Sequence, residues 1–137
     1  KLLDLSVEEL DKYDIICING AQFFTDLVSF CKIVLSKNKS IYAYGSPTKA
    51  SLLLINSELN INMIKNSFED NALKCNKYIP GTDVKIINTK KIKIDSGSII
   101  IILAWNFSKE VEMRLKSKNI SNTKLFIPLP KLNVKKI

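Results

Sequence analysis

Along this chain, short runs of apolar residues alternate with longer segments in which apolar residues recur at helical spacing. Apolar runs of strand length that are bounded by Gly, Asn, Lys or Pro predict β-strands. Segments with apolar residues three and four positions apart predict helices that pack through one side. We expect strands over residues 41–44, 60–67, 84–87, 98–105 and 124–127, helices over residues 21–37, 48–56 and 108–118, and a short helical turn at 6–9.

The run from Ser98 to Trp105 carries the strongest strand signal. It is a continuous apolar, mostly β-branched run, which is typical of a strand buried on both faces of a parallel sheet. Helices and strands alternate along the chain, which indicates α/β architecture with right-handed crossovers. We therefore predict a single, Rossmann-like, three-layer α/β domain with a mostly parallel sheet of about five strands. Pro128 and Pro130 stop the last strand, and the lysine-rich tail is expected to fray.

The turn Gly45-Ser46-Pro47 joins the strand at 41–44 to a helix. Glycine permits a tight turn, serine can cap a helix, and proline fits the first helical position. The free N–H groups of that helix and the nearby charge of Lys49 favour an anion beyond the strand. The alternative is that these residues only provide a good helix start, and the turn by itself leaves both interpretations open.

Polar and aromatic residues also follow two other predicted strands. Asp70 comes after the second strand, where nucleotide-binding α/β sheets often place an acid against a ribose hydroxyl. Trp105 and Asn106 end the central strand, where open α/β sheets bind ligands. The alternatives are a solvated loop acid at Asp70, a core residue at Trp105 and a helix cap at Asn106. No GxGxxG follows the first strand, so a dinucleotide fingerprint is absent.

Length and composition place the chain among ordinary globular domains. Its 137 residues suit about one domain, and 46% of them are hydrophobic. The longest apolar run, 99–105, is far shorter than the roughly 20 residues that cross a bilayer, so we expect no membrane partner. The chain begins with Lys1 rather than Met, and we interpret it as a piece of a longer protein.

Charge and reactive side chains restrict the function further. The formal net charge is +8, but Arg114 is the sole arginine and the lysines are scattered, so we expect no nucleic-acid partner. Three cysteines without CxxC spacing (Cys17, Cys31 and Cys75) indicate reduced thiols in a cytoplasm. Histidine, the commonest general base and metal ligand, is absent. The absence of histidine therefore weighs against a self-contained enzyme, and we expect no metal site within this chain.

Four motifs, in order and covering nearly the whole chain, resemble a known family. They are YGSPTKA at 44–50, KYIPGT at 77–82, LAWNF at 103–107 and FIPLP at 126–130. The first is similar to the family's YGAPAKG, the second to its K/R-Y-x-PG-T loop, the third to its LAWNF and the last to its IPxP. The family is the C-terminal domain of the SAM-dependent sugar C-methyltransferases, which act on nucleotide-activated deoxysugars.

The resemblance implies a division of labour within a longer enzyme. An upstream zinc-binding region and a central SAM-binding domain would supply the structural zinc, the SAM and the catalytic residues. The C-terminal domain would bind no cofactor, would be inactive alone, and would help to hold the sugar nucleotide beside the SAM-binding domain. The substrate-binding candidates are Tyr44, Gly45, Ser46, Pro47, Lys49, Asp70, Tyr78, Trp105 and Asn106.

The chain departs from the family pattern at three positions of the first motif. Ser46 and Thr48 stand where the family has Ala, and Ala50 stands where it has Gly. Two other hypotheses remain at this point. The chain can be a stand-alone module that binds a nucleotide or nucleotide sugar in regulation, or a purely structural interaction domain without a cleft.

Overall fold

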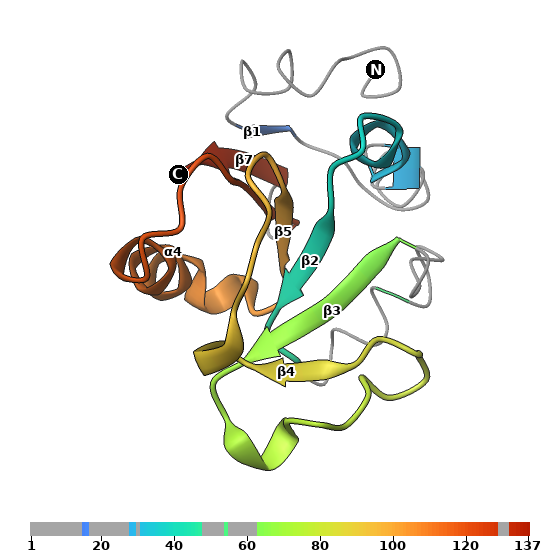
Figure 1. The fold of residues 1–137 in the computed structure, drawn as a ribbon, viewed down its shortest axis with the longest axis vertical. Helices are drawn as coiled ribbons and strands as arrows, with labels where there is room; N and C mark the ends of the chain where they lie inside the picture. The colour runs from blue at the N-terminus through green and yellow to red at the C-terminus, as the bar shows by residue number, and fades with distance from the viewer. Residues whose placement is uncertain (1–14, 17–27, 30, 48–53, 55–62, 129–131) are drawn as a thin grey trace.

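The computed structural model describes residues 15–16, 28–29, 31–47, 54, 63–128 and 132–137 (Figure 1). Its described strands form one seven-stranded sheet with the order β1-β7-β6-β5-β2-β3-β4. They are β1 (Ile15–Ile16), β2 (Ile41–Tyr44), β3 (Ile64–Glu69), β4 (Ile86–Asn88), β5 (Ile99–Ile102), β6 (Lys124–Ile127) and β7 (Leu132–Lys136).

Five neighbouring strands of this sheet, β6, β5, β2, β3 and β4, run parallel to one another. Each parallel step requires a crossover connection, which is why helical segments alternate with strands in the sequence. Beyond β6, β7 pairs antiparallel with β6, and β1 pairs antiparallel with β7. The predicted Rossmann-like α/β fold with a mostly parallel sheet is confirmed.

The last strand, β7, corrects the expectation of a frayed lysine-rich tail. Val134 is buried and lies opposite Phe126 of β6 in the antiparallel ladder. Beyond the strand, the backbone N–H of Ile137 donates to the Thr123 carbonyl at 2.9 Å. Strand pairing with β6 therefore outweighs the solvation of the two lysines that end the strand, of which Lys135 is half-buried beside Glu112 and Lys136 is exposed.

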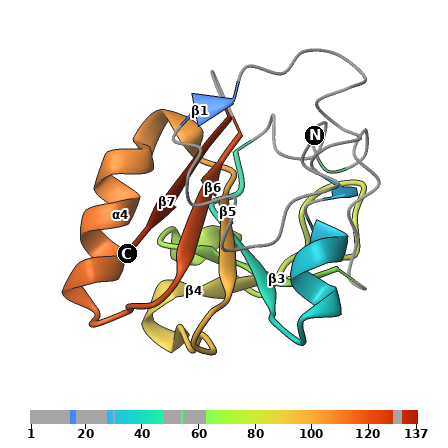
Figure 2. The same ribbon diagram turned by 90° about the horizontal axis from the view of Figure 1, so that it is seen from above.

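The core consists of two apolar layers, one on each face of the sheet. Ile99, Ile100, Ile101 and Ile102 of β5 are all fully buried, so successive side chains enter opposite layers. One layer contains Val111 and Leu115 of α4 (Ser108–Ser117). The other contains Cys31 and Val34 of the helical residues 31–36. Figure 2 shows these two helical segments on opposite sides of the sheet, as a three-layer fold requires.

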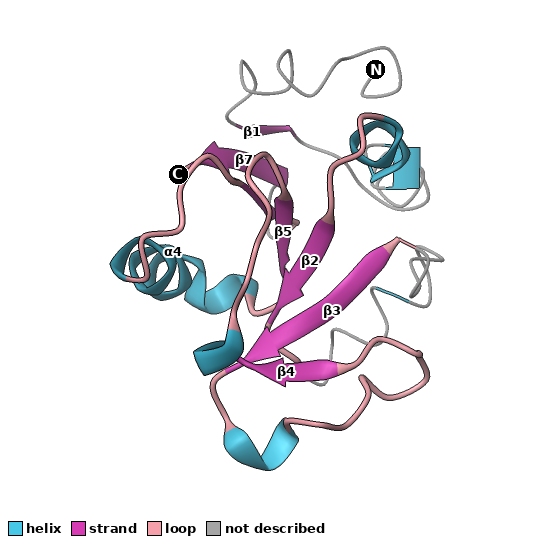
Figure 3. Cartoon of the chain, viewed as in Figure 1, coloured by secondary structure: helices cyan, strands magenta, loops and turns pink. Residues whose placement is uncertain are grey.

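Three short helical turns follow the carboxyl ends of β3, β4 and β5 (Figure 3). They are η2 (Ala72–Lys74), η3 (Thr89–Lys91) and η4 (Trp105–Phe107). The parallel ladder directs these ends to the same edge of the sheet. The loops that follow these three strands therefore leave the sheet from one edge.

Two details at the end of β5 differ from the sequence-based expectation. The strand stops at Ile102, because the N–H groups of Leu103 and Ala104 both donate to the Tyr44 carbonyl, at 2.9 and 3.2 Å, and end the regular ladder. Trp105 thus begins η4 rather than completing the strand. Asn106 is exposed and does not cap α4, whose N-cap is Phe107 without a side-chain hydrogen bond.

Among the remaining strand predictions, those at 41–44 and 124–127 have the predicted bounds, whereas the second and third strands begin later than expected, at Ile64 and Ile86. The expected turn at 6–9 and nearly all of the helix at 48–56 lie outside the described residues. Of the expected helix at 21–37, the described residues 28–29 and 31–36 are helical. Within the described part of the chain, no helix combines the length and the apolar character needed to span a membrane.

Candidate functional site

The turn after β2 is held between β3 and β5. Gly45 has φ +95°, and a Cβ at this position would lie 2.7 Å from the Cβ of Ala104. Its N–H donates to the Phe68 carbonyl at 2.7 Å, and its own carbonyl accepts from the Ser67 hydroxyl at 2.7 Å. Only glycine fits this conformation and this close approach without strain. The turn is therefore placed accurately relative to both neighbouring strands.

A cavity of about 260 Å³ opens at this turn, and we name it the Asp70 cavity. Its walls come from the carboxyl ends of β2 and β3, the segment after β5, and α4. The lining residues are Tyr44, Gly45, Ser46, Pro47, Glu69, Asp70, Lys74, Ala104, Phe107, Glu110, Val111 and Arg114. It thus lies beyond the carboxyl ends of parallel strands, where open α/β sheets bind ligands.

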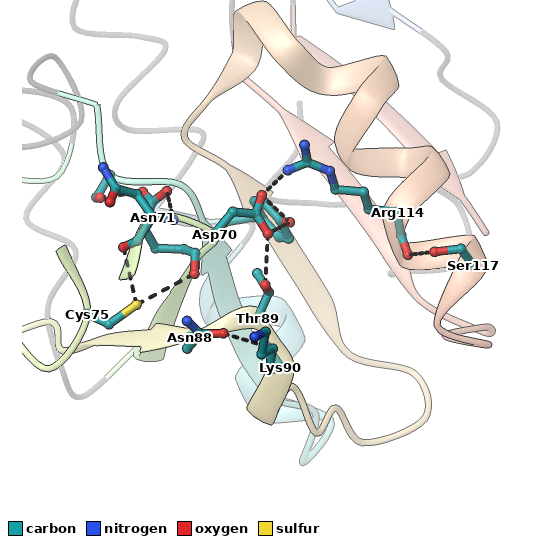
Figure 4. Close-up of polar contacts among 11 residues, drawn as sticks. Asp70, Asn71, Cys75, Asn88, Thr89, Lys90, Arg114 and Ser117 are labelled. Atoms are coloured by element: carbon teal, nitrogen blue, oxygen red, sulfur yellow. Dashed lines mark hydrogen bonds and ion pairs between the residues drawn. The ribbon is translucent and has the colours of Figure 1, made fainter. Parts of the chain in front are cut away.

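Asp70 is the centre of the polar contacts in this cavity (Figure 4). The Tyr44 hydroxyl lies 3.0 and 3.2 Å from its two carboxylate oxygens, and the Thr89 hydroxyl donates to it at 2.8 Å. Arg114 reaches the same carboxylate from α4 and forms an ion pair with it. Asp70 is therefore not a freely solvated loop acid, although its side chain remains 38% exposed.

The protonation of Tyr44 follows from this setting. Burial raises the pKa of Tyr44 to about 12, the negative charge of Asp70 acts in the same direction, and Arg114 opposes both. The contact with the Tyr44 hydroxyl and the charge of Asp70 raise the pKa of Arg114. At neutral pH the tyrosine therefore keeps its proton as a donor to Asp70, and the arginine stays charged.

A second group of contacts surrounds Glu69 at the other side of the turn. The Ser46 hydroxyl donates to one carboxylate oxygen at 2.6 Å, and the Asn71 N–H donates to the other at 3.1 Å. The Lys74 ammonium donates to the Ser46 carbonyl at 3.2 Å. Three carboxylates (Glu69, Asp70 and Glu110) and two cations (Lys74 and Arg114) thus line the Asp70 cavity.

A neighbouring cavity of about 310 Å³, which we name the Tyr78 cavity, lies against the loop between β3 and β4. It is lined by Ser46, Pro47, Leu73, Lys74, Lys77, Tyr78, Pro80 and Ile86. Ser46, Pro47 and Lys74 border both cavities. The two cavities are thus adjacent and share one wall.

The structure brings together most of the site residues that the sequence predicted. Tyr44, Gly45, Ser46, Pro47 and Asp70 line the Asp70 cavity, and Tyr78 lines the Tyr78 cavity.

Of the other three predicted residues, two line neither cavity and one lies outside the described residues. Trp105 is partly buried against both core layers and lines neither cavity. The exposed Asn106 also lines neither cavity. Lys49 lies outside the described residues, together with the helix start that was expected to bind an anion.

Sequence reasoning missed Arg114, Glu69, Lys74 and Thr89 as members of this site. Glu69 ends a strand directly before Asp70, so the rule that selected Asp70 applies to it equally. Arg114 lies 44 positions from Asp70, and its position on α4 follows no motif. The one feature of the sequence that could have drawn attention to Arg114 is that it is the sole arginine.

The model of the C-methyltransferase C-terminal domain family matches residues 4–130, and the chain belongs to this family. The chain is also similar to C-methyltransferase NovU from Streptomyces niveus, with 27% identity over 101 residues. That alignment covers 74% of this chain and 24% of NovU, so the chain spans about a quarter of the relative's length. The family resemblance seen in the four motifs is confirmed.

Proposed function

We propose that this domain holds a nucleotide-activated deoxysugar for a SAM-dependent C-methyltransferase. The observation that carries the proposal is the Asp70 cavity, which lies beyond the carboxyl ends of parallel strands in a member of a C-methyltransferase domain family. Charged and hydroxyl side chains line it, as recognition of a polar, charged ligand requires.

The contacts of Asp70 suit recognition of a sugar hydroxyl. The Tyr44 and Thr89 hydroxyls both donate to this carboxylate, which is therefore held in a defined orientation. A partly exposed carboxylate has lone pairs left to accept a hydroxyl from a ligand. We therefore assign substrate binding to the Asp70 cavity.

Lys74 is placed to contact the ligand's phosphates, since its ammonium lies at the wall shared by both cavities. An ammonium acts on phosphate as a mobile point charge.

We assign the chemistry to other parts of the full-length protein. SAM, a structural zinc and the catalytic residues belong to upstream domains, of which the SAM-binding domain is the partner of this one. The binding energy of the non-reacting part of the substrate then orients the sugar carbon toward the methyl donor. We place this enzyme in the cytoplasm, without a nucleic-acid or membrane partner.

The proposal is tested by calorimetric titration of this chain with dTDP-rhamnose, UDP-glucose and GDP-fucose, beside SAM and NAD. We expect one sugar nucleotide to bind and neither cofactor to do so. Asp70→Asn should weaken that binding about tenfold, since it removes the charge from the accepting group.

Asp95→Asn is the matched control, because Asp95 is 69% exposed and contacts Lys65 rather than either cavity. Binding of none of the sugar nucleotides would overturn the proposal. Equal weakening by Asp70→Asn and Asp95→Asn would also overturn the proposal, because the affinity would then not depend on the Asp70 cavity.

A further inference from the structure

The Tyr78 cavity differs from the Asp70 cavity in charge. Lys74 and Lys77 line it and no carboxylate does, whereas three carboxylates line its neighbour. The Lys77 ammonium makes no hydrogen bond or ion pair with the residues that the structure describes. A phosphate group is therefore favoured at the Tyr78 cavity and is repelled by the carboxylates of the other.

Exposed apolar groups also gather around this cavity. Leu73 and Tyr78 are 79% and 57% exposed, and both are among the large hydrophobic residues that the described part of the chain leaves in solvent. Pro80 adds a further apolar surface to the same wall. An exposed aromatic ring beside aliphatic groups offers a surface on which a planar heterocycle stacks.

The backbone holds Tyr78 in a defined position. The Ile86 N–H donates to the Lys77 carbonyl at 2.8 Å, and the Ile79 N–H donates to the Val84 carbonyl at 3.0 Å. Tyr78 itself lies opposite Lys85 in an isolated bridge. The neighbouring Ile79 is buried, so alternation along the extended segment leaves the Tyr78 ring outside the core. The ring is thus placed before any ligand arrives.

We propose that the Tyr78 cavity binds the nucleobase half of the substrate and the Asp70 cavity its sugar half. The base stacks on Tyr78, the diphosphate lies between Lys74 at the shared wall and Lys77 of the Tyr78 cavity, and the hexose donates hydroxyls to Asp70. This assignment rests on the proposed function, because it divides the same ligand between two adjoining cavities. The ligand then has a single orientation along the edge of the sheet, with its base at the Tyr78 cavity and its sugar at the Asp70 cavity.

The test compares free nucleotides with sugar nucleotides. The chain and its variants are titrated calorimetrically with dTDP, UDP and GDP and with dTDP-rhamnose, UDP-glucose and GDP-fucose. Tyr78→Ala should weaken the free nucleotide and its sugar conjugate alike, by about tenfold, while Tyr78→Phe keeps the affinity because the ring remains. Lys77→Gln should also weaken both about equally. Asp70→Asn should weaken only the sugar conjugate.

Lys85→Gln provides the matched control, since this exposed lysine lies on the same loop but lines neither cavity. A reversed pattern, in which Asp70→Asn weakens the free nucleotide and Tyr78→Ala does not, would overturn the assignment and leave the proposed function standing. If no sugar nucleotide bound, both proposals would be overturned. Thermal melting of each variant identifies losses that come from unfolding.

Discussion

The middle of the sheet and its carboxyl edge differ in what their side chains contact, although the same strands supply both. In the middle, Ile99–Ile102 are fully buried on both faces of β5. At the edge, Asp70 is partly exposed and is contacted by donors from β2, η3 and α4. The middle therefore supplies most of the stability, while the edge supplies groups that a ligand can contact.

The largest expected effect is loss of stability in the middle of the sheet. Ile101→Ala should lower the free energy of unfolding by about 2–5 kcal/mol, because it removes buried methyl groups and leaves a cavity. Urea denaturation measures this change. Leu73→Ala is the control at the edge, where 79% exposure predicts a change within about 0.5 kcal/mol. Comparable losses in both variants would contradict the distinction between the two regions.

A smaller effect is expected where the edge meets the core. Gly45→Ala should cost about 1–3 kcal/mol, because the residue has positive φ and its new Cβ would press against Ala104. Adding Ala104→Gly should restore part of the loss. Gly97→Ala is the control, since it shares a positive φ but meets only the flexible Lys39 side chain. Thermal unfolding that ranked Gly97→Ala as the costlier change would refute the close approach.

The pH dependence of stability tests the edge itself. Folding raises the pKa of Tyr44 from 10.0 to about 12, so above pH 10 the unfolded chain loses a proton that the folded chain keeps. This contribution to stability is therefore fully present below pH 10. It is lost as the pH rises toward 12, with a loss of about 1.4 kcal/mol at pH 11. Burial also raises the pKa of Cys31 to about 12, so the wild type must be compared with Tyr44→Phe. The variant should decline less steeply in denaturant titrations, and parallel curves would contradict this contribution.

The smallest effect belongs to an ion-pair group outside both regions. Glu112 of α4 contacts Lys116 at 2.9 Å and Lys135 of β7 at 3.4 Å. Lys116, the nearer cation, holds the pKa of Glu112 below its usual value, and Lys135 adds to the effect. The stability that these ion pairs contribute is therefore present above the usual pKa of a glutamate and is lost as the pH falls through the lowered pKa of Glu112. Glu112→Gln should cost about 0.5 kcal/mol at neutral pH. Urea denaturation at low and high salt should show a difference that disappears in high salt.

Most of the fold could be predicted because its signals are local. The strands at Ile41–Tyr44 and Lys124–Ile127 have the predicted bounds, and α4 differs by one residue at its end. Apolar runs and helical periodicity report burial directly, since each depends on neighbouring positions in the sequence. The tail at 132–136 was missed because a lysine-rich strand becomes stable only through pairing with β6.

The candidate site could be predicted only in part, for a related reason. The turn at 45–47 and Asp70 follow strand ends, so strand prediction locates them at the edge of the sheet. Trp105 and Asn106 satisfied the same rule but line neither cavity, because β5 ends at Ile102 and the chain turns into η4. The direction of a side chain at the end of a strand depends on the residue at which the strand stops, and an apolar run does not specify that residue.

The sequence by itself determined the class of fold, the family and the turn that contains Gly45. These depend on hydrophobic periodicity and on short motifs, which are local properties. Only the tertiary structure decided that Arg114, Thr89 and Tyr44 meet at Asp70, and that a second cavity adjoins the first. Contacts between residues 19 to 44 positions apart depend on the parallel ladder and the packing of α4, and no local pattern specifies either.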